Sequence, residues 1–219
     1  MQSRSSLSRS TAHRLLKRLV HAEYVEHDLV TRSYRPGRVL TEIGAALSRD
    51  AHVHETDRAV LQRLAAATKE TVHLVALRAT NVIFLDSVEG SQMGSAIGRV
   101  GRTLPSHATA AGKVLLAALT DAEVKAIYPV ELIRGGRGHS SVPRVDFLAE
   151  LELVRARGYA TNDGETEPDV SAVAVPLLDR FGFARAAVSV TAPRSRASDA
   201  WMRKTALHAA RITAGETLS

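Results

Sequence analysis

The chain has 219 residues, of which 45% are apolar and 24% are charged, with a formal net charge of +6 and no cysteine. This length fits one large domain, or a small module joined to a medium one. No apolar run approaches the ~20 residues that span a bilayer, the N-terminus lacks the apolar segment of a signal peptide, and the missing cysteines exclude disulfides and thiolate metal sites. We therefore expect a cytoplasmic protein with no membrane partner.

The positive charge is concentrated at the N-terminus. Residues 1–38 hold eight Lys and Arg against three Asp and Glu, whereas the remaining residues hold 21 against 20. Binding to nucleic acid releases counterions from phosphates and needs cations gathered on one element. The distribution therefore indicates a basic N-terminal module.

The segment from Leu7 to Pro36 predicts a helix followed by a β-hairpin. Ser8 or Ser10 can cap the helix, and the segment from Tyr24 to Arg35 has a polar tip between two extended stretches. One apolar helix face is formed at i, i+3, i+4 and i+7 by Ala12, Leu15, Leu16 and Leu19. A basic helix with hydroxyl residues in its first turn can enter a major groove while the hairpin lies along phosphate. The alternative is a surface helix with a solvated basic face; the hairpin and the charge distribution favour DNA.

Further elements are predicted in chain order by periodicity and turn residues. Before Lys113, we expect helices at 38–48 and 54–68, a hairpin of strands 71–78 and 81–88, a third strand at 95–100 and a loop at 101–106. After residue 106, we expect helices at 109–119 and 121–128, an irregular stretch at 129–143, a helix at 146–157 ended by Gly158, strands at 170–178 and 184–191, and a helix at 197–214. This order predicts an α+β fold with a mainly antiparallel sheet flanked by helices.

Two stretches could bind a ligand. The loop that enters a helix at Ser106–Lys113 leaves backbone N–H groups free for an anion such as a carboxylate, although ordinary capping by Thr109 explains the same residues. Ser189 and Thr191 lie on one face of a predicted strand, where their hydroxyls need partners in the protein, in water or in a ligand.

Metal binding and catalysis are both poorly supported. His52 and His54 form a weak metal pattern, and alternate positions of a helix do not share a face. Ser106, His107 and Asp163 could be assembled into a hydrolytic set, but no nucleophile-elbow sequence is present. We expect no enzyme activity, no metal and no cofactor.

Three separated segments resemble the IclR family of bacterial transcription regulators. LSRSTAHRLLKRL with EYVEHDLVTRSYRPG is similar to the family's recognition helix and wing, and VGRTLPSHATAAGKVLLAAL and RARGYATNDGETEPDVSAVAVPLLD are similar to its two effector-domain signatures. The resemblance implies a partial winged helix-turn-helix module at residues 1–36, shortened at its N-terminus. It also implies a linker helix at 37–52 and a GAF-like effector-binding domain at 53–219.

The resemblance also implies roles for individual residues. The side chains expected at base edges or phosphate are Arg9, Ser10, Thr11 and Arg14, and those expected mainly at phosphate are Lys17, Arg18, Arg32 and Arg35. The residues matching the family's effector pocket are Ala110, Ala111, Asn162 or Asp163, Ala172, Ser189 and Thr191. The implied partners are a double-stranded DNA operator, a small carboxylate or aromatic-acid effector and further copies of the chain in a homodimer or tetramer. An alternative function is a stand-alone small-molecule sensor that has lost DNA binding.

Overall fold

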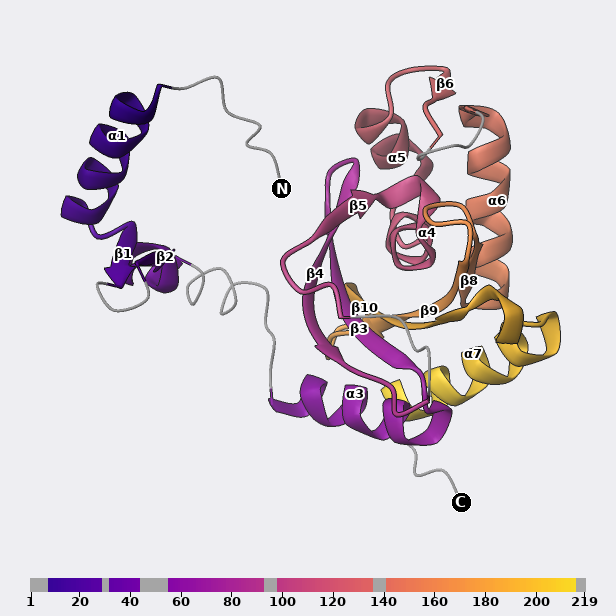
Figure 1. Cartoon of the computed structure of the whole chain (residues 1–219). Coiled ribbons are helices and arrows are strands. Elements are labelled where there is room, and N and C mark those ends of the chain that lie inside the picture. Colours follow the sequence, from indigo (N-terminus) through magenta and orange to yellow (C-terminus); the bar gives the residue numbers. More distant parts are fainter. Residues whose placement is uncertain (1–7, 29–31, 44–54, 93–97, 136–140, 216–219) are drawn as a thin grey trace. The chain divides into compact units, whose positions relative to one another are not determined.

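The computed structural model divides the chain into two units, residues 1–52 and 53–219, which we describe separately (Figure 1). The structure describes residues 8–28, 32–43, 55–92, 98–135 and 141–215.

The N-terminal unit is built from a capped helix and a hairpin. Its elements are α1 (Arg9–His21), β1 (Val25–Asp28), β2 (Ser33–Pro36) and a further helical segment at 38–43. The Oγ of Ser8 accepts a hydrogen bond from the backbone N–H of Thr11 at 3.2 Å, which confirms a predicted N-cap. The predicted apolar face is only partly covered, since Leu16 is half-buried while Leu15 is 49% exposed. The predicted helix at 38–48 continues beyond the described residues.

Gly37 connects the hairpin to the C-terminal end of α1 through close backbone contacts. Its N–H donates to the carbonyl of Tyr24 at 2.9 Å, and the N–H of Val39 donates to the backbone carbonyl of Glu23 at 3.1 Å. A β-carbon on Gly37 would lie 2.3 Å from the Glu23 oxygen, so no larger residue fits this close backbone contact.

The C-terminal unit contains a curled, six-stranded antiparallel sheet in the order β5-β4-β3-β10-β9-β8. The strands are β3 (Thr71–Arg78), β4 (Asn81–Val88), β5 (Thr103–Pro105), β8 (Ala160–Asp163), β9 (Val170–Leu178) and β10 (Ala184–Pro193). The helices are α3 (Glu55–Thr68), α4 (Ala110–Ala117), α5 (Asp121–Ile127), α6 (Arg144–Arg157) and α7 (Asp199–Thr213), with 3-10 turns η1 (Ser106–Ala108) and η2 (Arg194–Arg196). The predicted α+β class with an antiparallel sheet is confirmed.

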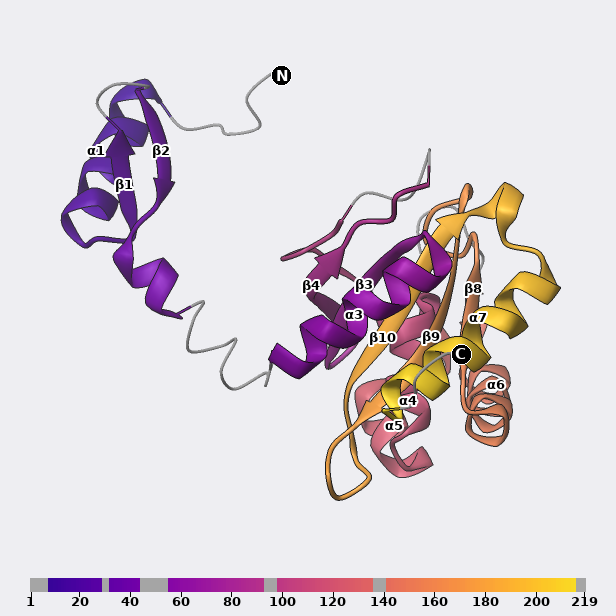
Figure 2. The ribbon, with the colours of Figure 1, turned by 90° about the horizontal axis from the view of Figure 1, so that it is seen from below.

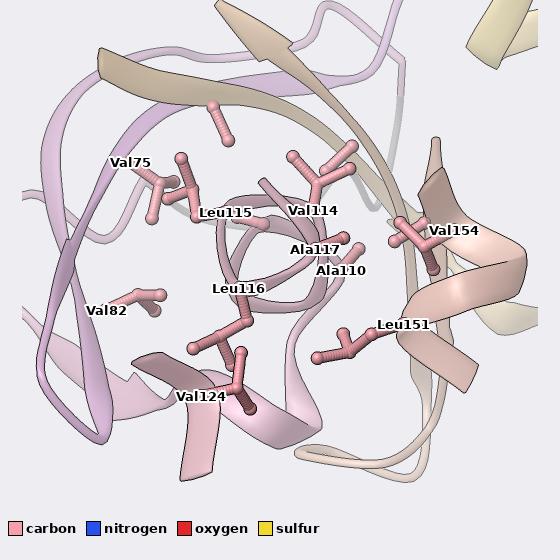
Figure 3. Close-up of a cluster of buried hydrophobic side chains, with 14 of the residues drawn as sticks. Val75, Val82, Ala110, Val114, Leu115, Leu116, Ala117, Val124, Leu151 and Val154 are labelled. Atoms are coloured by element: carbon pink, nitrogen blue, oxygen red, sulfur yellow. The ribbon is translucent and has the colours of Figure 1, made fainter. Parts of the chain in front are cut away.

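Helices cover both faces of this sheet. Figure 2 shows α3 and α7 lying across one face, while α4 lies inside the curl on the other, next to α6 (Figure 1). The α4 side forms the larger apolar core, in which Leu116 meets Val124 of α5 and Leu151 of α6 (Figure 3). The α3 side is packed by Leu61 and Leu64, both fully buried. Because α4 is enclosed all round, its N-terminus is held rigidly against the strands.

Three predictions about local structure were wrong. The third strand is β5 at Thr103–Pro105, inside the segment expected to be a loop; of the predicted strand at 95–100, residues 98–100 are not a strand and the rest lie outside the described residues. The strand β8, an edge strand paired with β9, was not predicted, because its four residues carry too little periodicity. The stretch expected to be irregular contains a short ladder of β6 (Leu132–Ile133) and β7 (Val142–Pro143). Within the described residues no helix has the length and apolarity to cross a bilayer.

Candidate functional site

The N-terminus of α4 is shaped by Thr109 and Gly112. The Thr109 Oγ1 accepts a hydrogen bond from the N–H of Gly112 at 3.0 Å and caps the helix, as its sequence position predicts. The N–H groups of Ala110 and Ala111, in the first turn, point beyond the end of the helix as in any helix N-terminus. Both residues are buried, so these donors lie in a site that excludes bulk water.

A small pocket lies at this helix end. Its free volume is about 20 Å³, roughly the room for one water molecule. It is lined by Phe84, Arg99, Leu104, Thr109, Ala110, Ala111, Asn162, Thr166, Val170, Ala172, Ser189 and Thr191. The structure therefore brings together six of the seven residues that the family motif suggested, drawn from α4, β8, β9 and β10.

Asp163, the seventh residue, does not line the pocket. Its carboxylate accepts hydrogen bonds from the hydroxyl of Ser171 at 2.8 Å and from Arg194 at 2.9 Å on the outer side of the sheet edge. These bonds, that of Ser171 first, hold the pKa of Asp163 below its usual value. Of the two alternatives Asn162 and Asp163, only Asn162 faces the pocket.

Asn162 also holds the chain that follows it. Its amide donates to the carbonyl of Ala108 and, at 3.4 Å, to Thr166, while its oxygen accepts from the N–H of Glu165 at 3.1 Å. Asn162 therefore joins η1 to residues 164–168, which we call the acidic turn.

The hydroxyl residues of β10 also line the pocket. Ser189 and Thr191 are 5% and 3% exposed, and the Thr191 hydroxyl lies 3.4 Å from Nδ1 of His73. Since alternate residues of a strand share a face, both hydroxyls point the same way. The pocket lining thus combines these hydroxyls with apolar side chains such as Phe84 and Leu104.

Arg99 is a pocket residue that the sequence analysis missed. It is 8% exposed, it is the one charged residue among the described residues that line the pocket, and its guanidinium pairs with the carboxylate of Glu167 in the acidic turn. Burial lowers the pKa of Arg99, and Glu167 opposes that shift. No local pattern marked Arg99, since its partner is far away in sequence.

Lys113 makes a second buried ion pair with the acidic turn. Its Nζ lies 2.7 Å from carboxylate oxygens of both Glu150 on α6 and Glu165. Burial raises the pKa of Glu165 above its usual value even though Lys113 lowers it. The acidic turn is therefore tied down by Asn162, by Lys113 and, next to the pocket, by Arg99.

The residues considered for hydrolysis do not come together as a catalytic set. The Ser106 Oγ lies 2.7 Å from the hydroxyl of Tyr128, and Asp163 is paired elsewhere, so these two do not form a relay with His107. His52 and His54 lie outside the described residues, and within the described ranges no three metal-binding side chains cluster.

On the N-terminal unit, the proposed DNA-contacting cations are mostly exposed. Arg14, Lys17 and Arg18 are exposed on α1, where spacings of three and four place them on one face. Arg32 is exposed at the hairpin tip, and Arg35 pairs with Glu26 at 2.9 Å.

The first turn of α1 has its hydroxyls clustered on the cap. Ser8 Oγ lies 3.0 Å from the Ser10 hydroxyl and 2.8 Å from that of Thr11; Ser10 is exposed and Thr11 half-buried. The side chain of Arg9, the first residue of α1, lies outside the described part of the structure.

Comparison with known proteins defines the class of this chain. The family model described as bacterial transcriptional regulator IclR C-terminal matches residues 45–218, and that of the IclR helix-turn-helix domain matches residues 1–29. The chain belongs to the IclR family of bacterial transcriptional regulators.

Individual relatives agree with this assignment. The chain is 34% identical to the regulator XynR of Escherichia coli strain K12, over 89% of this chain and 77% of that protein. It is 31% identical to the regulator KdgR of Dickeya chrysanthemi, over 91% of this chain but only 65% of the length of that relative.

Solved structures show the same fold. The IclR protein of Thermotoga maritima superposes with a TM-score of 0.75 at 27% identity, covering 95% of this chain and 86% of that one. The inducer-binding domain of a double mutant of PobR from Acinetobacter, in complex with 3-hydroxybenzoic acid, superposes with a TM-score of 0.67 at 27% identity, covering 75% of this chain and 96% of that one.

Proposed function

We propose that this chain binds operator DNA through α1 and the β1–β2 hairpin, and that a small organic acid bound in the C-terminal pocket controls that binding. The observation that carries the proposal is the pocket itself. Four residues from the two effector-domain signatures and two hydroxyl residues from the last strand of the sheet line it together with a buried arginine.

The chemistry of the pocket suits a carboxylate with a short apolar body. The N–H groups at the start of α4 and the guanidinium of Arg99 favour an anion, and Ser189 and Thr191 offer hydroxyls to a second polar group. Phe84 and Leu104 offer an apolar surface to the body of the ligand. The acid bound by the related PobR domain belongs to this class.

The N-terminal unit suits a DNA backbone. Exposed cations on one side of α1 and at the hairpin tip can neutralise phosphates, and the first turn of α1 carries Ser10 for base edges. Such helices read operators as pairs, so we propose that a homodimer or tetramer is the binding form, acting in the cytoplasm. The acid would bias the spacing of two DNA-binding units, which makes the control a coupling between two sites.

The test is binding of the full chain to DNA from its own upstream region, at two salt concentrations, with and without a panel of small carboxylic acids. We expect binding that weakens steeply with salt, exceeds that to scrambled DNA and changes when one acid is added. Absence of DNA binding by a folded chain that still binds an acid would instead support the stand-alone sensor.

A further inference from the structure

The pocket is small in this structure, and its arginine is already paired within the protein. Its free volume of about 20 Å³ leaves no room for an organic acid, the smallest of which have several non-hydrogen atoms. The lining group with the strongest attraction for a carboxylate, the guanidinium of Arg99, is already paired with Glu167. The protein therefore places one of its own carboxylates on the cation that an acid would use.

We propose that Glu167 is an internal competitor for Arg99, and that the ligand is an acid whose carboxylate replaces that of Glu167 on the guanidinium. This inference rests on the proposed function and adds to it the group that recognises the acid and the event that opens the pocket.

The two partners differ in how easily they can leave the pair. The side chain of Arg99 is 9% exposed, whereas that of Glu167 is 34% exposed. A carboxylate that can rotate out into solvent is hydrated there, so leaving the ion pair costs it little free energy. A buried guanidinium cannot be hydrated in this way and must keep a partner. When a second carboxylate enters, the two anions repel each other, so Glu167 is the one that departs.

The local backbone restricts the movement to the acidic turn. Gly164 has a φ of +80°, and its N–H donates to the backbone carbonyl of Val170 at 3.1 Å. The N–H of Val170 in turn donates to the backbone carbonyl of Glu167 at 3.0 Å. The turn is thus closed at both ends on β8 and β9, and Asn162 and Lys113 hold its first half. Release of Glu167 therefore loosens only the second half, where the pocket-lining Thr166 keeps its 3.4 Å hydrogen bond to Asn162.

The exchange selects for charge. A neutral amide or ester of the same shape offers no anion to replace Glu167 on Arg99, so it leaves the ion pair in place. The carboxylate form of a ligand is therefore expected to bind while its amide does not.

The experiment is calorimetric titration of the full chain with pyruvate, benzoate and 3-hydroxybenzoate and with the amide of each. In the variant Glu167→Gln the competitor has no charge, so we expect the acid that binds the unmodified chain to bind about tenfold or more tightly, the order of one charge-assisted hydrogen bond. The amides are expected to remain non-binding. Arg99→Lys keeps the charge but loses the planar guanidinium that can donate two hydrogen bonds to a carboxylate, so it is expected to weaken binding of the acid.

The matched control is Glu165→Gln, a change of the same type two residues away in the pair with Lys113. It is expected to leave acid affinity within about twofold, which is below the effect of one hydrogen bond. Hydrogen exchange at the backbone amides of residues 166 and 167 gives a second readout: faster exchange on adding acid to the unmodified chain, and fast exchange without acid in Glu167→Gln. If Glu167→Gln fails to fold, Glu167→Asp, which is too short to reach Arg99 equally well, replaces it with the same expectation.

The outcomes separate the two proposals. If an acid binds the unmodified chain and binds Glu167→Gln no more tightly, the competitor proposal is overturned while the effector pocket stands. If no acid binds the unmodified chain but one binds Glu167→Gln, the competitor proposal is supported. If no acid binds either chain, both the acid effector and the competitor are overturned.

Discussion

The carbonyl oxygen of Ser106 lies against Gly112, 2.0 Å from the position that a β-carbon on Gly112 would occupy. This contact folds η1 back onto the first turn of α4 and places Thr109 where it caps the helix. The pocket-facing N–H groups of Ala110 and Ala111 depend on that arrangement.

We predict that Gly112→Ala destabilises the C-terminal unit by about 1–3 kcal/mol, the cost of overpacking a dense site. The neighbouring atom is backbone, which cannot turn away as a side chain could. Urea unfolding measures the loss. The exposed Ala118→Ser at the other end of the same helix is the control, expected to change stability by less than about 0.5 kcal/mol. An unchanged midpoint for Gly112→Ala would show that η1 can move away from α4.

For the pocket, Ser189→Ala is expected to weaken acid binding by roughly twofold to tenfold, the range of one hydrogen bond. Ser189 is 5% exposed and lines the pocket, so its hydroxyl is available to a ligand there. Calorimetry with the acid identified by the panel measures the change. Ser171→Ala, on the neighbouring strand and bonded to Asp163 instead, serves as the control. Equal effects of both variants would mean that Ser189 acts on the sheet and not on the ligand.

For DNA binding, Arg14→Ala is expected to weaken binding to all sequences and to reduce the slope of log affinity against log salt by about 0.9, the value for one lost phosphate contact. Arg14 is exposed on α1 on the same face as Arg18. Titration of fluorescent DNA at four salt concentrations gives the slope. Lys204→Ala, an exposed cation of α7, removes the same charge from the other unit and is expected to leave the slope unchanged. A slope unaffected by Arg14→Ala would remove this residue from the DNA interface.

Glu165 predicts a pH dependence of stability. Its folded-state pKa is raised, chiefly by burial, so the folded chain holds this proton more tightly than the unfolded chain does. Its contribution to stability therefore falls as pH rises from the ordinary glutamate value of about 4.3 through the raised value. Relative to the unmodified chain, Glu165→Gln is expected to gain stability between pH 4 and pH 7. Urea unfolding at several pH values tests the sign, and a relative loss over this range would show that the attraction of Lys113 outweighs burial.

Secondary structure was predicted correctly where a long segment had one clear hydrophobic periodicity. The strands at 71–78, 81–88 and 170–178 have the bounds that alternation and β-branched residues suggested. Short elements failed, because β5 and β8 are edge strands of three and four residues whose position is set by the neighbouring strand.

The residues of the candidate pocket were likewise predictable only in part. The two signatures pointed to Ala110, Ala111 and Ala172, and the alternation of the last strand pointed to Ser189 and Thr191. Arg99 was missed, and Asn162 could not be told from Asp163, because adjacent strand residues point to opposite faces and only the pairing register decides which is inside.

The sequence by itself determined the capped basic helix, the hairpin, the antiparallel sheet and the helix N-terminus at Thr109, because local hydrogen bonding and hydrophobic periodicity specify these over a few residues. Only the tertiary structure decided that Arg99 lies buried in the pocket and that Glu167, 68 positions away, is paired with it. An ion pair between distant residues leaves no periodic trace, since its energy arises only once the folded sheet has excluded water from both partners.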